Sequence, residues 1–131
     1  MQMTLKLIAP LFILLLFVQC KKKEAPYELY LYTTDASHSG LTLFVDGVEK
    51  GALPVVSSTV MPDDESAKAL TLHLTLPTGK YVLEAKDEEG NLQKGAKLQF
   101  SSHKETLTGI KAGCEVRSLE DDHCMTVRFF E

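Results

Sequence analysis

The sequence predicts an all-β protein, an antiparallel β-sandwich of about seven strands, after an N-terminal signal segment. Two observations predict this fold class. Apolar residues alternate with polar ones at a period of two, and turn-forming residues recur between the alternating stretches. Alternation places one set of side chains on each face of a strand, so each strand is expected to be half buried.

Six stretches carry the alternation, and each is expected to turn its apolar residues toward one core. Short strands with frequent turns favour a sandwich or a barrel. The expected inward-facing residues are Tyr27, Leu29 and Leu31; Leu41, Leu43 and Val45; Leu70, Leu72, Leu74 and Leu76; Tyr81, Leu83 and Ala85; Ala96, Leu98 and Phe100; and Met125, Val127 and Phe129.

Turn chemistry separates these stretches. Asp46-Gly47 is the residue pair favoured in a type I′ hairpin, because both turn positions need a positive φ. Other turns are expected at 35–40, 77–79 and 87–91, all rich in Gly, Pro, Asp or Ser. The stretch 57–68 is predicted to be a loop with one helical turn from Pro62.

The N-terminus has the layout of a signal peptide over residues 1–19. Lys6 precedes an apolar run of twelve residues, Leu7 to Val18. A bilayer-spanning helix needs about 20 apolar residues, whereas the apolar core of a signal peptide has about 7–15. A signal peptide is therefore favoured over a transmembrane anchor.

Phe17-Val18-Gln19-Cys20, followed by three lysines, resembles the lipobox of bacterial lipoproteins. The resemblance implies that Cys20 becomes the first residue of the mature protein and carries the acyl chains that anchor it in a membrane. It further implies a place in the bacterial cell envelope. Lys21 stands where Asp marks inner-membrane retention in some bacteria, which favours the outer membrane. The alternative is an ordinary secretory signal with an incidental cysteine.

The remaining chain divides into a basic tether, 20–26, and a single β-domain, 27–131. The chain has 18 acidic and 14 basic residues, of which one acidic and four basic residues precede Tyr27. The domain therefore has 17 acidic and 10 basic residues and a net charge of −7. A strongly acidic domain argues against nucleic-acid binding, which needs basic surface to offset phosphates.

Assigning Cys20 to lipid leaves two cysteines, Cys114 and Cys124. In an oxidising envelope such a pair is predicted to form a disulfide bond. The alternatives are two free thiols or a ligand set that includes His123.

Residues 41–100 show a weak resemblance to the PEGA and carboxypeptidase-regulatory-like modules. The matching residues are Phe44-Val45-Asp46-Gly47, Gly51-Ala52-Leu53-Pro54 and Leu76-Pro77-Thr78-Gly79-Lys80-Tyr81-Val82. The resemblance implies a β-sandwich with a scaffolding or binding role and transfers no catalytic residue.

Candidate catalytic and metal-binding residues are scattered. None of the four histidines, His38, His73, His103 and His123, has the short spacing of a metal-binding pair. Ser101-Ser102-His103 lacks the Gly-x-Ser-x-Gly elbow of a serine nucleophile. The acidic clusters 63–65, 87–89 and 120–122 do not follow the calcium-binding loop pattern and are expected to be solvated turns. We therefore predict no catalytic residue, no metal and no cofactor.

Tyr30 and Tyr32 lie on the strand face opposite Leu29 and Leu31, and form a candidate binding surface. The alternative is that they pack under a neighbouring loop. The sequence thus favours a membrane-anchored, non-enzymatic module that binds or scaffolds a protein or a polysaccharide. A second hypothesis is a small periplasmic inhibitor that presents the loop 115–123 to an enzyme. A third is an enzyme built from dispersed residues.

Overall fold

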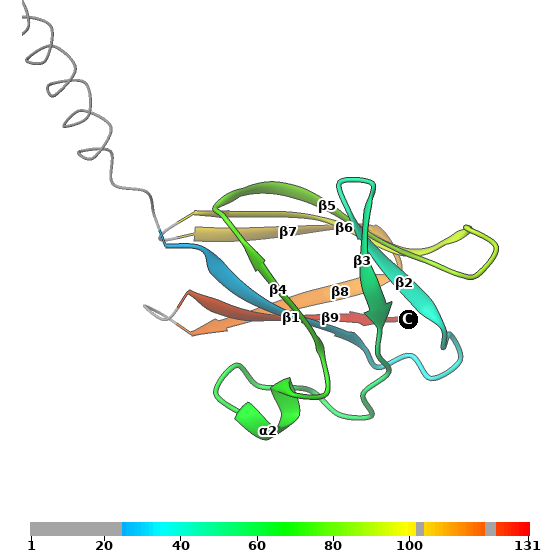
Figure 1. Cartoon of the computed structure of the whole chain (residues 1–131), viewed down its shortest axis with the longest axis horizontal. Coiled ribbons are helices and arrows are strands. Elements are labelled where there is room, and N and C mark those ends of the chain that lie inside the picture. Colours follow the sequence, from blue (N-terminus) through cyan, green and yellow to red (C-terminus); the bar gives the residue numbers. More distant parts are fainter. Residues whose placement is uncertain (1–24, 102–103, 120–122) are drawn as a thin grey trace, which may run out of the picture.

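A computed structural model describes residues 25–101, 104–119 and 123–131. In this part of the chain, nine strands form two sheets packed face to face, and one short helix lies in a connection between strands (Figure 1). Sheet A has the strand order β4-β1-β9-β8, and sheet B has the order β3-β2-β5-β6-β7. The elements are β1 (Tyr27–Thr33), β2 (Leu41–Val45), β3 (Val48–Leu53), α2 (Glu65–Lys68), β4 (Leu72–Leu76), β5 (Gly79–Lys86), β6 (Leu92–Ser101), β7 (Lys104–Lys111), β8 (Gly113–Leu119) and β9 (Cys124–Phe130).

The predicted all-β sandwich is confirmed, with nine strands in place of about seven. Six strands match the alternating stretches, and β3 is the second strand of the predicted Asp46-Gly47 hairpin. The two additional strands are β7 and β8, neither of which shows a clean apolar alternation. β7 and β8 follow each other along the chain, and each lies at the edge of its own sheet. All strand pairs within the sheets are antiparallel except β1 with β9, which pair in parallel at the centre of sheet A.

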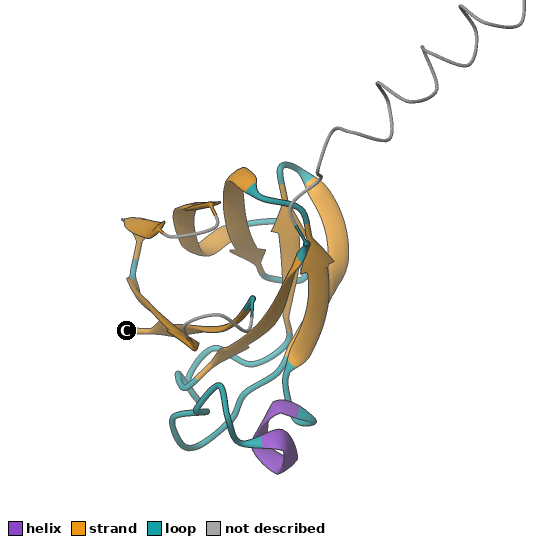
Figure 2. Ribbon diagram, turned by 90° about the vertical axis from the view of Figure 1, so that its left-hand side faces the viewer, coloured by secondary structure: helices purple, strands orange, loops and turns teal. Residues whose placement is uncertain are grey.

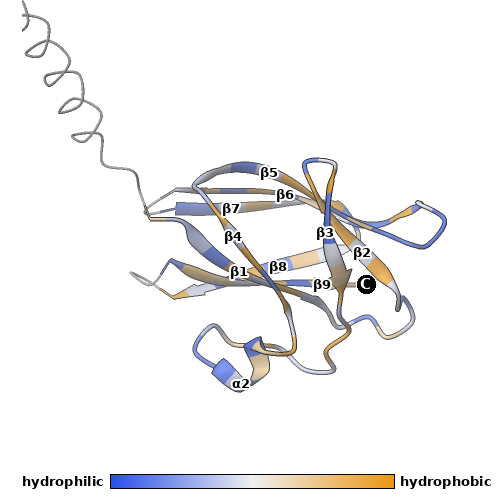
Figure 3. Ribbon diagram, in the orientation of Figure 1, coloured by the Kyte–Doolittle hydropathy of each residue, from blue (hydrophilic) through white to orange (hydrophobic). Residues whose placement is uncertain are grey.

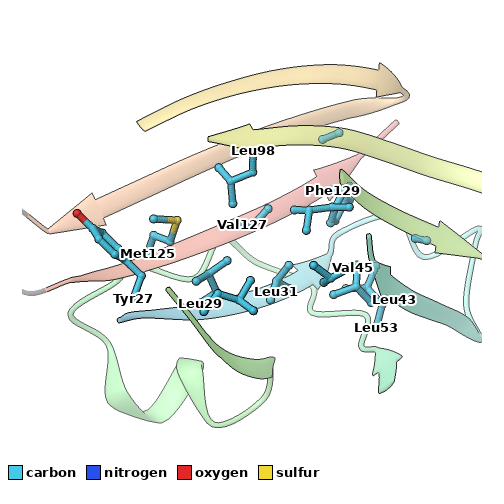
Figure 4. Close-up of a cluster of buried hydrophobic side chains, with 14 of the residues drawn as sticks. Tyr27, Leu29, Leu31, Leu43, Val45, Leu53, Leu98, Met125, Val127 and Phe129 are labelled. Atoms are coloured by element: carbon cyan, nitrogen blue, oxygen red, sulfur yellow. The ribbon is translucent and has the colours of Figure 1, made fainter. Parts of the chain in front are cut away.

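The core lies between the two sheets and is built from the predicted inward-facing residues (Figure 4). Several of these side chains are at most 1% exposed: Leu29 and Leu31 of β1, Leu43 of β2, Leu98 of β6 and Val127 of β9. Burial of such side chains contributes roughly 1.5–3 kcal/mol each. Figure 3 shows how hydrophobic and hydrophilic residues alternate along the strands that enclose this core.

Two local predictions hold, and one is wrong. Asp46 and Gly47 both have positive φ, of 50° and 80°, as the type I′ hairpin between β2 and β3 requires. The loop before β4 contains the predicted helical turn, α2, although it begins at Glu65 and not at Pro62; its N-cap residue Asp64 accepts a hydrogen bond from the backbone N–H of Ala67. Leu70 does not face the core: β4 begins only at Leu72, and the Leu70 side chain is 62% exposed.

The long connection from β3 to β4, residues 54–71, packs on the outer face of sheet A, the face turned away from sheet B (Figure 2). Val56 and Val60 from this segment are buried together with Tyr32 of β1, and Ala67 of α2 packs against them. Around Tyr32, sheet A is therefore covered on both faces, by the core on one side and by this segment on the other. We call residues 54–71 the covering segment.

Candidate functional site

The outer face of sheet A carries the polar residues that strand alternation turns away from the core. On β1 these are Glu28, Tyr30 and Tyr32. The register places His73 of β4 beside Tyr30, and Cys124 of β9 beside Glu28. The covering segment divides this face into a buried part around Tyr32 and an open part around Tyr30.

Tyr32 is fully buried, so its predicted place on an exposed binding surface is wrong. The covering segment lies over its ring, and its hydroxyl oxygen accepts a hydrogen bond from the backbone N–H of Val60 at 2.8 Å. Alternation specifies which face a residue occupies, but it does not specify what covers that face. Tyr32 is thus a packing residue that holds the covering segment on sheet A.

Tyr30 remains half-buried and stands at the centre of a cluster of ring and charge contacts. Its ring stacks on the imidazole of His73, with the centroids 4.7 Å apart and the planes within 7°. The ammonium nitrogen of Lys68 lies 4.8 Å from the centre of the same ring. Partial burial raises the pKa of the Tyr30 hydroxyl, which is therefore a neutral hydrogen-bonding group at physiological pH.

Lys68 is the cation of this cluster, and its side chain is only 8% exposed. Its ammonium lies 2.9 Å from a carboxylate oxygen of Glu65, one turn earlier in α2, and 3.9 Å from the sulfur of Cys124. The hydrogen bond with Glu65 raises the pKa of Lys68 and outweighs the opposing effect of burial. A lysine held in this way is a fixed positive charge rather than a nucleophile, which would need a lowered pKa.

Glu28 is the fixed anion at the other side of Tyr30. Its carboxylate accepts a hydrogen bond from the Thr75 hydroxyl and contacts the Nε2 atom of His73. These two contacts, the bond from Thr75 first, lower the pKa of Glu28. Both partners of the carboxylate belong to β4, so Glu28 also fixes the edge of the sheet beside Tyr30.

A surface hollow of about 370 Å³ opens at this cluster. Glu28 and Tyr30 form one side, residues 62–68 form another, and the ends of β8 and β9 complete it at Leu119 and Cys124. The hollow therefore combines one aromatic ring, one fixed ammonium and several carboxylates. We call it the Tyr30 hollow. Sequence alternation identified Tyr30, but Lys68 and Glu65 could not be assigned because only the folded covering segment brings them to β1.

The predicted disulfide bond between Cys114 and Cys124 is not formed. The two residues lie on neighbouring strands, but Cys114 pairs with Phe129 whereas Cys124 pairs with Leu119. Five residues of strand therefore separate them, roughly 17 Å at the usual rise of a strand. A disulfide needs α-carbons within about 7 Å, so this register excludes the bond.

The histidines that the sequence analysis considered as catalytic or metal-binding residues do not form one cluster where the structure describes them. His73 contacts Glu28, His38 contacts Asp35, and His123 stacks on Tyr27, so each of these histidines belongs to a different cluster. His103 and the acidic cluster 120–122 lie outside the described residues. Within residues 25–101, 104–119 and 123–131, no three His, Cys, Asp or Glu side chains are grouped to hold a metal ion.

A second polar cluster escaped the sequence prediction, which treated residues 35–40 as an ordinary turn. Asp35 is buried and receives hydrogen bonds from Ser37, from Nδ1 of His38 at 2.9 Å and from Lys94 at 3.0 Å. The bond from Ser37 is the largest of the effects that lower the pKa of Asp35. Ser37 and His38 both contact the carboxylate itself, which is the arrangement of a braced turn and not of a serine nucleophile with its base.

Cys20 and its flanking lysines lie outside the described residues. In the part of the chain that the structure describes, no helix is long and apolar enough to cross a membrane. In comparisons with known proteins, no family model, no curated protein and no solved structure matches the chain. The geometry of the Tyr30 hollow and the N-terminal sequence pattern are therefore the observations on which a function can be proposed.

Proposed function

We propose that this protein is a lipid-anchored envelope protein whose β-sandwich acts as a non-enzymatic binding or scaffolding domain. The lipobox-like stretch that ends at Cys20 supports the anchor, and Lys21 favours the outer membrane. The first strand begins at Tyr27, only seven residues after Cys20. Such an arrangement would hold the folded domain close to the membrane that carries the acyl chains.

The Tyr30 hollow is the observation that carries the binding role. Its aromatic ring is held by His73 and its ammonium by Glu65, so the polar groups are fixed before any ligand arrives. Pre-organisation of this kind lowers the entropic cost of binding. Its volume of about 370 Å³ falls near the lower end of the roughly 300–1,000 Å³ range of ligand pockets, which is large enough for a protein side chain or a single sugar ring.

The charges of the hollow disfavour anionic ligands. Glu28, Asp63 and Glu65 contribute three carboxylates against the single ammonium of Lys68. A neutral sugar or a cationic protein side chain fits this balance better than an anion does. Tyrosine supplies a flat apolar surface with a polar end, which suits both sugar rings and protein side chains.

Site-specific photo-crosslinking in intact cells tests this role. A photoreactive amino acid at Asp63, which is exposed at the hollow, is expected to capture a protein or glycan. The same group at Val48, 57% exposed at the tip of the β2–β3 hairpin on the other sheet, is the control. Adducts at Asp63 that disappear in Tyr30→Ala, together with none at Val48, support the proposal. Equal labelling at both positions, or none at Asp63, contradicts it.

The alternative role, a small periplasmic inhibitor, has less structural support. It relied on a disulfide that would pin residues 115–123 as a protruding loop. Residues 115–119 instead belong to strand β8, and the disulfide is not formed. The inhibitor hypothesis keeps only the acidic residues 120–122, which lie outside the described part of the chain.

A further inference from the structure

Three lysines gather on the outer face of sheet B, at the end of the sandwich where β1 begins. Lys80 of β5 pairs with Gln99 of β6, which pairs with Thr106 of β7. In the next row Val82 pairs with Lys97, which pairs with Thr108. Residues paired across an antiparallel sheet share a face, so these side chains line one surface. Lys104, paired with Ser101, adds the third lysine one row closer to the end.

Among the described residues these three lysines have no ion-pair partner, which sets them apart from most other cations of the domain. Lys68, Lys94, Arg117 and Arg128 are committed to ion pairs with carboxylates. Within the described residues, no ion pair or hydrogen bond is formed by the side chains of Lys80, Lys97 or Lys104. All three are exposed. We call the surface formed by Lys80, Lys97, Gln99, Lys104, Thr106 and Thr108 the lysine face.

The lysine face is hollowed and free of carboxylates over its own area. A depression of about 410 Å³ lies between its two inner lysines, with Val82, Gln99, Thr106 and Thr108 in its lining. The nearest acidic groups stand at its margins. Glu84 lies one row beyond Val82 on β5, and Asp46 accepts a hydrogen bond from the Val82 backbone N–H. An acidic domain thus presents a locally basic surface with hydroxyl and amide donors between the charges.

This face lies at the anchored end of the domain. The Tyr27 hydroxyl, at the start of β1, donates a hydrogen bond to the carbonyl oxygen of Ser101 at 2.9 Å, and Ser101 pairs with Lys104. Figure 1 and Figure 3 show the start of β1 beside the hydrophilic start of β7. Six residues lie between Cys20 and Tyr27, and the seven steps that join these two residues span at most about 25 Å when fully extended.

The opposite face of the sandwich is acidic. Around the Tyr30 hollow it carries Glu28, Asp63, Asp64 and Glu65 against the single ammonium of Lys68, whereas Glu115 on β8 is paired with Arg117 and Arg128. A domain with one basic face and one acidic face takes a preferred orientation beside an anionic surface, because the first is attracted and the second repelled. The lysine face would turn toward the headgroups, and the Tyr30 hollow would turn away from them.

We propose that the lysine face docks the domain on the anionic lipid headgroups of the membrane that holds acylated Cys20. This inference rests on the proposed anchor. Each lysine near an anionic surface strengthens docking roughly fivefold, so three together shift the docking equilibrium on the order of a hundredfold. Docking fixes the orientation of the domain and presents the Tyr30 hollow to soluble partners on the side away from the lipid.

The test uses the acylated protein, purified from membranes and reconstituted in vesicles of phosphatidylcholine with or without phosphatidylglycerol. A fluorophore is attached at Thr106→Cys on the lysine face, or at Asp63→Cys on the opposite face, and a headgroup-labelled lipid acts as the quencher. Protein without an added cysteine is labelled in parallel. Quenching at position 106 is expected to rise with phosphatidylglycerol and to fall again in high salt, whereas position 63 stays unquenched.

Matched triple variants identify the charges responsible. K80Q/K97Q/K104Q is expected to reduce quenching at position 106 to the level seen with phosphatidylcholine alone. K50Q/K111Q/R117Q removes the same charge elsewhere and is expected to leave quenching unchanged. The proposal is overturned if quenching is equal in both vesicle types or if the two triple variants have equal effects. It is also overturned if the lysine face binds soluble polygalacturonate in place of lipid. The mass of residue 20 is measured on the same sample, so absence of acylation is recognised separately as failure of the anchor.

Discussion

The ammonium of Lys94 lies 3.0 Å from a carboxylate oxygen of Asp35, and both side chains are buried. Asp35 follows β1 of sheet A, whereas Lys94 belongs to β6 of sheet B. Lys94 also donates a hydrogen bond to the carbonyl oxygen of Phe130, at the end of β9. One ion pair therefore joins both sheets at the end of the sandwich opposite the start of β1.

The Asp35–Lys94 pair predicts an acid-sensitive contribution to stability. The pKa of Asp35 is lowered in the folded state from its ordinary value of 3.8. Its contribution to the free energy of unfolding is thus fully present above that value and is lost as the pH falls below it. In urea unfolding, the difference in the free energy of unfolding between wild type and Asp35→Asn is expected to be smaller at pH 3 than at pH 7. Glu88→Gln, an exposed carboxyl in the β5–β6 turn, is the control. If that difference in the free energy of unfolding is the same at pH 3 and at pH 7, the ionised Asp35 carboxylate does not contribute to stability as predicted.

The Tyr32 hydroxyl predicts a specific effect on the covering segment. Tyr32→Phe keeps the ring but leaves the buried N–H of Val60 without its acceptor, which costs about 1–3 kcal/mol. Chemical denaturation measures this cost, and limited proteolysis is expected to cut residues 54–71 faster in the variant. Tyr30→Phe removes a hydroxyl that stands at the open hollow, so neither the stability nor the rate of proteolysis is expected to change in this variant. Equal proteolysis of wild type and Tyr32→Phe contradicts the assigned role.

The cysteine register predicts that reducing agents leave the domain unchanged. Burial raises the pKa of the Cys114 thiol to about 12, so almost no reactive thiolate is present at neutral pH. The unfolding midpoint is expected to be the same with and without dithiothreitol, and Cys114 is expected to react with iodoacetamide only after unfolding. An intact mass lower by two hydrogens, restored on reduction, would falsify the register between β8 and β9.

Gly113 predicts a steric limit at the start of β8. A β-carbon built there would lie 2.2 Å from the ring of Phe130, its partner on β9. Gly113→Ala is expected to destabilise the domain by about 1–3 kcal/mol, as overpacking does. The double variant Gly113→Ala/Phe130→Ala is expected to lose less stability than the sum of the losses in the two single variants, because the smaller side chain at position 130 removes the clash. Strict additivity of the two effects in denaturation experiments counts against this packing.

The sequence predicted the inward faces of the strands well, because alternation directly reports which side of a sheet a residue occupies. Leu29, Leu43 and Leu98 are examples. The sequence prediction was wrong where burial depends on a segment that packs over the sheet, or where a contact depends on the register between two strands. Tyr32 is buried by a segment more than twenty positions away in the chain, and the spacing of Cys114 and Cys124 says nothing about their pairing partners. Strands β7 and β8 were missed because edge strands bury few side chains and so carry little alternation.

The anchor at Cys20 is the central claim, since the proposed envelope role and the docking of the lysine face both depend on it. Intact mass spectrometry of protein extracted from membranes tests it most directly. The wild-type chain is expected to begin at Cys20 and to exceed its polypeptide mass by a diacylglycerol group and an acyl chain, whereas Cys20→Ala carries no lipid. A wild-type protein without a lipid-sized mass increase would contradict the account.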